Sequence, residues 1–463
     1  MAEKITCISP VDGSVYASRP VATKKEIAAT FAAARAAQSK WKHVPIAERA
    51  AYCSAAVDAM VAMKDEIVPE LAWQMGRPVR YGAGEVRGFE ERARYMIGIA
   101  EQGLADIDPG PKDGFVRYIK REPIGVVLTL APWNYPYLTA VNSVIPAIMA
   151  GNTVVLKHAA STLLVAERFQ QAFDKAKLPK GVFQHLVLSH DQIGEIIAAG
   201  LPNMVCFTGS VAGGKAMEEA SAGTFINVGL ELGGKDPAYV RPDANMAHAI
   251  ENLVDGSFFN SGQSCCAIER IYVHKKVWTD FLDGFVELTK KYVLGSPLED
   301  ATTLGPMVRP EAATFVRKQI ASAVRAGAKP HIDPKSFPGD KAGTPYMAPQ
   351  VLTNVTHKMG VMMEESFGPV IGIMKVSDDK EAIGLMNDSP YGLTAAIWTE
   401  DVGAARAIGD EIATGTVFMN RCDYLDPALT WTGVKDTGRG ATLSRVGYEA
   451  LTRPKSYHLR TKT

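Results

Sequence analysis

The sequence predicts an α/β protein with a doubly wound parallel sheet, a second α/β domain and a small β arm. At 463 residues the chain is too long for one ordinary core, so two or three domains are expected. Residues 124–232 alternate short, continuously apolar runs with helical stretches, which is typical of a parallel sheet covered by helices. Residues 115–122 and 451–460 alternate in the way of exposed strands, and we expect them to pair as an arm.

The composition is that of a soluble globular protein, with 47% hydrophobic and 22% charged residues. Lys+Arg and Asp+Glu are both 50, so no net charge attracts nucleic acid or an acidic membrane. The N-terminus lacks the apolar run of a signal peptide, and no stretch is long enough to span a membrane. The six scattered cysteines form no disulfide framework, and no Cys-x-x-Cys or His-Glu-x-x-His occurs. We therefore expect a cytoplasmic protein without a metal site and without nucleic-acid or membrane partners.

The first hundred residues are predicted to be mostly helical. Residues 1–20 suit irregular or edge-strand chain with a turn at 10–13. Thr23 followed by Glu26 is a capping-box pattern, which indicates a helix start. Helical periodicity continues over three ranges: 27–39, 46–63 and 85–102.

The parallel sheet is predicted from the alternation that follows. Strands are expected at 125–130, 153–157, 184–188, 204–208 and 226–230. Helices are expected at 138–150, from a cap at Ser161, at 192–199 and from Val211. The less regular alternation beyond residue 232, with helices at 247–259 and 278–293 and a strand at 271–274, predicts the second α/β domain. Because ligands bind beyond the carboxyl ends of parallel strands, we look for a site there.

The stretch 258–267 reads Phe-Phe-Asn-Ser-Gly-Gln-Ser-Cys-Cys-Ala and holds two adjacent cysteines. A cysteine attacks as thiolate, so its surroundings must favour loss of the proton. Cys265 is our candidate nucleophile. A single intracellular cysteine is more often a buried structural residue, and other stretches must decide between the two roles.

Three further stretches support a site at Cys265. Asn134 follows a predicted strand between aromatic residues and prolines, and its amide is a candidate oxyanion donor, although a turn asparagine often only satisfies backbone. Glu231 ends an apolar strand before Gly233 and is a candidate general base, or simply a strand-end carboxylate. Residues 207–214 run from a strand into a Gly-rich helix start, a geometry that binds phosphate but is a weak signal by itself.

Together and in this order, these stretches resemble the aldehyde dehydrogenase superfamily over essentially the whole chain. Four other segments carry the same resemblance: 150–157, 364–370, 387–393 and 415–420. The resemblance implies an NAD(P)-binding domain at 1–107 and 124–232, a catalytic domain at 233–436, and an oligomerisation arm at 108–123 and 437–463. It also implies a homodimer or homotetramer joined through that arm.

The resemblance further implies oxidation of a small-molecule aldehyde to its acid with NAD+ or NADP+, through a thiohemiacetal and a thioester. Cys265 falls on the nucleophile, Glu231 on the base and Asn134 on the oxyanion donor, while Cys266 occupies a variable position. The implied cofactor contacts are Trp133, Lys157, Ala160, Gly209, Ser210, Gly214, Glu365 and Phe367.

Two positions depart from the family pattern. Ala160 replaces a glutamate that binds both ribose hydroxyls and repels a 2′-phosphate, so we expect NADP+ to be accepted or even preferred. His158 could help, although a loop-exposed histidine is the simpler interpretation. Thr442 stands where some members have a second carboxylate, which leaves Glu231 as the clearer base.

The substrate tunnel is the part for which the sequence is least informative. Its candidate lining residues are Tyr135, Thr139, Phe259, Arg421, Tyr424, Leu425 and Trp431. Arg421 is a candidate for meeting an acidic substrate tail, or is a surface residue at the tunnel mouth. Semialdehydes, aliphatic aldehydes and aromatic aldehydes all stay open.

Three other functions compete with this interpretation. In a CoA-acylating aldehyde dehydrogenase, CoA would cleave the thioester, but the presence of Glu231 favours water. A cysteine hydrolase would need a histidine placed to pair with Cys265, and none is visible. A non-catalytic member of the fold would be expected to lack Cys265, Glu231 or Asn134, and all three are present.

Overall fold

Two parallel sheets organise the chain in the computed structural model, which describes residues 3–462. The first sheet has the order β18-β8-β7-β4-β5-β6, and all its neighbours are parallel except β18. Its strands are β4 (Val126–Ala131), β5 (Thr153–His158), β6 (Phe183–His185), β7 (Met204–Thr208), β8 (Asn227–Glu231) and β18 (Gly438–Arg439). The predicted strand at 204–208 is confirmed residue for residue.

Helices cover both faces of this sheet because successive strand residues point to opposite sides. Val127 packs with α2, α4, α6 and α7, while Val126 and Leu128 pack with α1, α8 and α9. The helices are α1 (Lys24–Trp41), α2 (Ile46–Ala62), α3 (Lys64–Met75), α4 (Val79–Gly98), α5 (Ala100–Gly103), α6 (Pro136–Met149), α7 (Leu163–Lys175), α8 (His190–Ala198) and α9 (Val211–Ser221). The doubly wound arrangement is therefore confirmed.

Local sequence patterns predicted one helix start correctly and another wrongly. Thr23 and Glu26 form the expected capping box at α1. The cap expected at Ser161 is wrong: a 3₁₀ turn covers Ala160–Thr162, and α7 begins at Leu163 without a side-chain cap. Residues 1–20 contain a hairpin of β1 (Lys4–Ile8) and β2 (Val15–Pro20).

The second sheet has the order β11-β12-β13-β10-β9-β15-β16 and is parallel except at β11. Its strands are β9 (Asp236–Val240), β10 (Ile268–His274), β11 (Lys329–Pro330), β12 (Gln350–Thr353), β13 (Val370–Val376), β15 (Thr394–Trp398) and β16 (Thr416–Met419). Helices α10 (Met246–Phe258) and α11 (Trp278–Thr289) cover one face, and α14 (Asp379–Asn387) and α15 (Val402–Asp410) cover the other. This part of the chain also contains α12 (Pro310–Arg325), α13 (Gly360–Met363), β14 (Tyr391–Gly392) and β17 (Val434–Lys435).

Strand β9 was absent from the sequence-based prediction, although it lies at the centre of the second sheet. Asp236 and Pro237 open it, and both residue types argue against a strand. Asp236 is tolerated because its carboxylate accepts a hydrogen bond from Thr394 Oγ1 at 2.6 Å, and burial raises the pKa of Asp236 well above its ordinary value.

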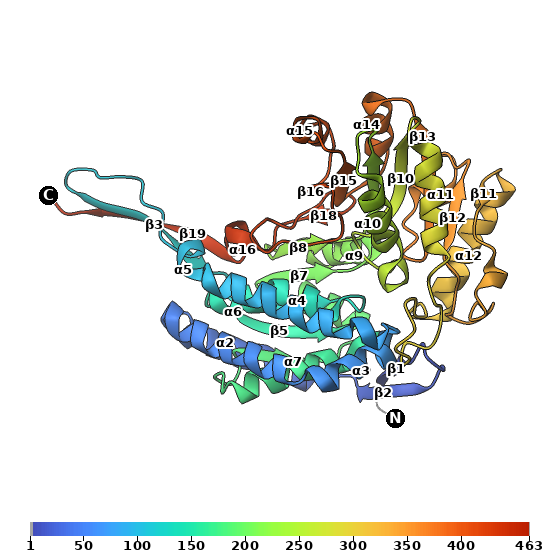
Figure 1. Cartoon of the computed structure of the whole chain (residues 1–463). Helices are drawn as coiled ribbons and strands as arrows, with labels where there is room; N and C mark the ends of the chain where they lie inside the picture. The colour runs from blue at the N-terminus through green and yellow to red at the C-terminus, as the bar shows by residue number, and fades with distance from the viewer. Residues whose placement is uncertain (1–2, 463) are drawn as a thin grey trace.

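The expected arm is a two-stranded sheet of β3 (Phe115–Pro123) and β19 (Thr452–Arg460), which projects from the rest of the chain (Figure 1). The strands pair antiparallel from Pro123 opposite Thr452 to Phe115 opposite Arg460, which confirms the predicted pairing. Helix α16 (Ser444–Ala450) leads into β19, whereas β18 joins the first sheet. Among residues 3–462, no helix is both long enough and apolar enough to cross a membrane.

Candidate active site

The loop before Cys265 has an unusual backbone that the surrounding structure holds in place. Asn260, Ser261 and Gly262 have φ values of 54°, 58° and 70°, all left-handed. A Cβ at residue 262 would lie 2.4 Å from the carbonyl oxygen of Gly368, so only glycine fits there. Ser261 Oγ donates to Gly305 O at 2.7 Å, and Gln263 Oε1 accepts from Val308 N at 2.8 Å. These bonds orient the chain that carries the thiol.

The amide of Asn134 points at this loop. Its Nδ2 donates to Gln263 O at 3.3 Å, which occupies one of its two N–H groups and leaves the other for a substrate. The main-chain oxygen of Asn134 accepts from Arg77 Nη2 at 2.5 Å and from Asn260 Nδ2 at 3.3 Å. These two hydrogen bonds to its main chain hold the turn that carries Asn134.

A buried ion pair supports this turn, and sequence reasoning did not find it. Arg77 Nη1 donates to Glu85 Oε2, and Glu85 Oε1 accepts from the N–H groups of Tyr137 and Leu138 at 2.9 and 3.1 Å. Those N–H groups open helix α6, where a carboxylate is favoured by the unpaired donors and the helix dipole. No local pattern predicts this pairing, because residues 77 and 85 gain their roles only through contact with residues 134–138.

Glu231 lies at the carboxyl end of β8 with both oxygens occupied. Thr208 Oγ1 donates to Oε2 at 3.1 Å, and Thr442 Oγ1 donates to Oε1 at 2.5 Å. Burial raises the pKa of Glu231 above its ordinary value, while the two hydroxyls act in the opposite direction. A carboxylate with raised pKa suits a general base. Thr442, which the sequence marked only as a missing glutamate, is therefore part of the site.

Cys265 is partly buried and is a free thiol, as is Cys266 beside it. A hydrogen bond with Cys266, burial and the nearby carboxylates Asp236 and Glu231 raise the pKa of Cys265 well above its ordinary value. The thiol must therefore lose its proton before its sulfur can act as a nucleophile. Glu231 is a base in the same cavities as that thiol.

Two cavities meet at Cys265 and Glu231. The first, of about 380 Å³, is lined by Trp133, Asn134, Gly209, Ser210, Gly233, Glu365 and Phe367 among others. The second, of about 290 Å³, is lined by Arg92, Tyr135, Asn142, Cys266, Tyr424, Leu425 and Trp431 among others. Thr139 and Thr208 border both cavities. Two ligands can thus approach the same sulfur from different sides.

One wall of the first cavity is suited to an anion such as a phosphate. Helix α9 opens beside it with Ser210 as N-cap, and its free N–H groups favour an anion. A Cβ at residue 209 would lie 2.6 Å from Phe207 Cζ, and one at residue 214 would lie 2.6 Å from Leu232 Cδ1. Gly209 lines the cavity, whereas Gly214 lets the helix pack closely behind it.

The comparison with known proteins covers nearly the whole chain. The model of the aldehyde dehydrogenase family matches residues 1–457. The chain belongs to the aldehyde dehydrogenase family. A relative from Mycobacterium avium (strain 104), named succinate-semialdehyde dehydrogenase (NADP(+)), is 32% identical over 98% of this chain and 96% of its own length.

Solved structures of aldehyde dehydrogenases share the fold. A succinic semialdehyde dehydrogenase from Streptococcus pyogenes in complex with NADP+ superposes with a TM-score of 0.93 at 28% identity, over 98% of this chain and 100% of that one. An NAD-dependent aldehyde dehydrogenase from Sinorhizobium meliloti gives 0.94 at 29% identity, over 100% and 92% of the two chains.

Two further candidate cofactor residues of this aldehyde dehydrogenase are Glu365, which lines the first cavity, and Lys157, which is absent from its lining. Glu365 accepts a hydrogen bond from Gly234 N at 3.0 Å, and burial raises the pKa of Glu365 to about 8. Lys157 is the last residue but one of β5 and is half-buried, and burial lowers the pKa of its ammonium. Its Nζ has no hydrogen-bond partner within residues 3–462, so it is available to a ligand.

The interpretation of His158 as a loop-exposed side chain is wrong. It is 4% exposed, with one ring nitrogen on Thr162 Oγ1 at 2.9 Å and the other on Pro136 O at 3.1 Å. Burial lowers the pKa of His158 to about 3, so the ring is neutral and brings no positive charge to the cofactor. Ala160 is exposed at the start of the 3₁₀ turn.

The tunnel candidates separate into two groups. Tyr135, Thr139, Tyr424, Leu425 and Trp431 line the second cavity, whereas Phe259 and Arg421 are absent from its lining. The ring of Phe259 packs edge-on against Tyr81 at 5.2 Å. The guanidinium of exposed Arg421 stacks on the Tyr424 ring at 3.6 Å.

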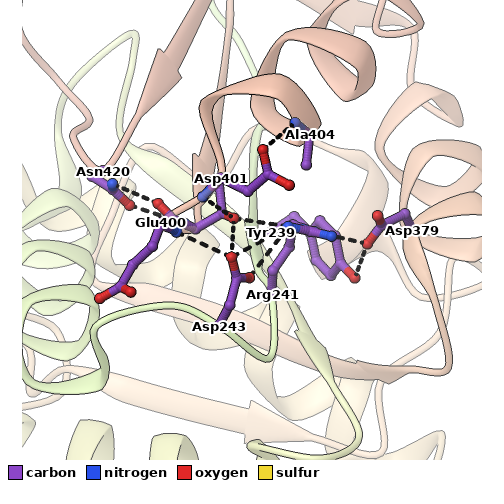
Figure 2. A network of polar contacts seen from close by, with 9 residues as sticks. Tyr239, Arg241, Asp243, Asp379, Glu400, Asp401, Ala404 and Asn420 are labelled. Carbon is purple, nitrogen blue, oxygen red and sulfur yellow. Dashed lines mark hydrogen bonds and ion pairs between the residues drawn. The ribbon is translucent and has the colours of Figure 1, made fainter.

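The loop that supplies Tyr424 and Trp431 is anchored where it leaves β16. Asn420 donates from Nδ2 to Thr399 O at 2.7 Å and accepts from Thr399 N at 3.0 Å. Asp243 accepts from Thr399 Oγ1 at 2.6 Å, and Figure 2 shows Asp243 and Arg241 in the same network of polar contacts as Asn420. This network holds the left-handed Asn420 from which the cavity wall begins.

Proposed function

We propose that this chain oxidises an aldehyde to its carboxylic acid with NADP+ or NAD+, using Cys265 as nucleophile and Glu231 as base. The observation that carries the proposal is the meeting of two cavities at Cys265, one of which is lined by Asn134, Glu231 and Cys265 together. The names of the relatives add that succinate semialdehyde is a first substrate to test.

Each residue has one chemical task. The Cys265 thiol gives its proton to water in the cavity and its sulfur forms a bond to the carbonyl carbon, while the Asn134 N–H and the Cys265 main-chain N–H stabilise the oxyanion. A bound nicotinamide would supply the acceptor for the hydride, held by Trp133, Lys157, Ser210, Glu365 and Phe367. Glu231 then takes a proton from the water that attacks the thioester carbon, and Cys265 leaves as the acid is released.

A panel of semialdehydes, aliphatic aldehydes and benzaldehydes, assayed separately with NAD+ and NADP+, tests the proposal. We expect nicotinamide reduction coupled one-to-one to acid formation with at least one aldehyde class. Acyl-CoA formation with no activity in the absence of CoA would instead indicate the CoA-acylating reaction. Aldehyde-dependent reduction with neither cofactor would contradict the proposal.

The absence of a carboxylate at Ala160 supports acceptance of NADP+. Lys157 has no acidic partner there and is free to meet a 2′-phosphate, and the NADP(+) relatives are consistent with this. Neutral His158 takes no part.

Replacing Ala160 with glutamate is expected to lower kcat/KM with NADP+ at least about tenfold relative to NAD+. Two like charges at close range repel by about 1 kcal/mol even in water, and about 1.4 kcal/mol corresponds to a factor of ten. Ala160→Gln has nearly the same size without the charge and should leave the ratio close to wild type. Equal effects of both variants on the two cofactors would show that the 2′-phosphate lies elsewhere.

The hydroxyl of Thr442 is predicted to set the pH dependence of deacylation. It donates to the Glu231 carboxylate and so favours the charged form, which is the form that acts as a base. In Thr442→Val the pKa of Glu231 should rise further, so the acid limb of kcat moves to higher pH. Turnover should fall at neutral pH and recover at alkaline pH.

A pH series of kcat for Thr442→Val checks this prediction. Thr432→Val is the matched control, because Thr432 donates to Gly440 O and does not contact Glu231. An unchanged acid limb in Thr442→Val would remove Glu231 as the group that titrates.

We also propose the division of the chain into an NAD(P)-binding part built on the first sheet, a catalytic part built on the second, and an oligomerisation arm. Val116 and Leu459 on the arm are each 49% exposed. A second copy of the chain is the partner that the arm suits, as a homodimer or homotetramer.

A further inference from the structure

We propose that Arg92 binds a carboxylate at the far end of the aldehyde substrate, so that oxo acids are preferred to uncharged aldehydes. The inference rests on the proposed function and concerns the second cavity, in which Arg92 shares the lining with Cys265 and Glu231. It replaces Arg421, which is exposed and stacked on Tyr424 outside this lining.

Arg92 is a buried cation that has no counter-ion among residues 3–462. It lies on α4 and is 9% exposed. Its Nη1 donates to Leu138 O at 2.6 Å and to Asn142 Oδ1 at 3.3 Å, and both acceptors are neutral. Within the described part of the chain, no carboxylate lies at ion-pair distance from it.

The other two nitrogens of Arg92, Nε and Nη2, have no hydrogen-bond partner within residues 3–462. Two of the three other buried arginines differ: Arg77 is paired with Glu85, and Arg270 places all three of its nitrogens on main-chain carbonyls. Because a buried guanidinium with open donors is costly, a ligand that supplies two acceptors and a negative charge is favoured. A carboxylate meets both requirements in bidentate geometry.

Other charges facing the cavity do not replace this ligand. Arg87 and Glu91 are exposed, and the Glu91 carboxylate accepts a hydrogen bond from Tyr424 OH at 2.7 Å. Asp423 also lines the cavity, but burial raises its pKa to about 7, so much of it is uncharged near neutral pH. Arg92 therefore supplies the buried positive charge of the second cavity.

The test compares aldehydes that differ only in the carboxylate: 4-oxobutanoate against butanal, and 5-oxopentanoate against pentanal. In the wild-type enzyme we expect kcat/KM to favour at least one oxo acid over its alkanal by about 50-fold or more. Arg92→Gln should lose about 100-fold on that oxo acid, mostly through KM, and less than about threefold on the alkanal. Arg92→Lys keeps the charge but loses the bidentate geometry, and should lie between the two.

Two controls locate the effect. Arg94→Gln makes the same change two residues later on α4, where the side chain is exposed and paired with Asp58 and Glu90. It should behave as wild type. Arg421→Gln tests the other arginine, and a charge-selective loss there but not in Arg92→Gln would overturn the proposal.

A binding measurement without turnover separates this inference from the proposed function. Trp431 lines the same cavity, so its fluorescence should report tighter binding of succinate than of butyrate to the wild-type enzyme. This comparison needs no variant and stands even if Arg92→Gln does not fold. If no aldehyde is oxidised but succinate still binds selectively, the proposed reaction fails and the anion site stands. Equal losses on oxo acids and alkanals, or equal binding of succinate and butyrate, would show that Arg92 does not bind the substrate carboxylate.

Discussion

Replacing Cys265 with alanine is expected to abolish steady-state aldehyde oxidation, with a loss of at least about 10⁴-fold in kcat. Removing a catalytic nucleophile elsewhere costs on the order of 10⁶-fold, because no other group can form the covalent intermediate. Nicotinamide absorbance with saturating aldehyde measures the loss. Cofactor binding should persist, since the residues of the first cavity keep their positions.

Cys266→Ala is the matched control for this prediction. Cys266 lies next to Cys265 and is 4% exposed, with its sulfur 3.5 Å from Ser264 Oγ. We expect it to keep activity within about tenfold of wild type, the range of a neutral packing change near a site. If Cys265→Ala stays active and Cys266→Ala does not, Cys266 is the nucleophile.

Replacing Glu231 with glutamine is expected to separate the two halves of the reaction. The first turnover should still produce a burst of reduced cofactor, while steady-state turnover falls by about 10²- to 10⁴-fold, the usual contribution of a general base. Glutamine has nearly the same shape: its oxygen can accept from one of the two threonine hydroxyls, and its amide N–H can donate to the other, so the site should keep its geometry. Only the group that takes the proton from water is lost.

Rapid mixing measures the burst, and intact-protein mass spectrometry detects the acyl group on the enzyme. An acyl adduct that builds up in Glu231→Gln and is absent from Cys265→Ala supports the assigned roles. Absence of both burst and adduct would mean that Glu231 is needed earlier, to deprotonate the thiol whose pKa the site raises. Full steady-state activity would exclude Glu231 as the base.

Sequence patterns predicted the elements whose causes are local. The capping box at Thr23, the strand at 204–208 and the helix start at Val211 each depend on residues a few positions apart. Where local signals compete, prediction was less reliable. Ser161 is a residue type that often caps helices, but it lies inside a 3₁₀ turn. Strand β9 was not predicted because it begins with Asp236 and Pro237, which are rare in strands.

The sequence by itself determined the family resemblance, both layers of the first sheet, the pairing of the arm and the candidate set Cys265, Glu231 and Asn134. These follow from motifs whose spacing along the chain carries the information. Only the tertiary structure decided which side chains support and complete the site. Thr442 reaches Glu231 across 211 residues, and Arg92 reaches Asn142 across 50, because strand pairing and helix packing bring them together. The burial and the open donors of Arg92 depend on such contacts, and no local pattern predicts them.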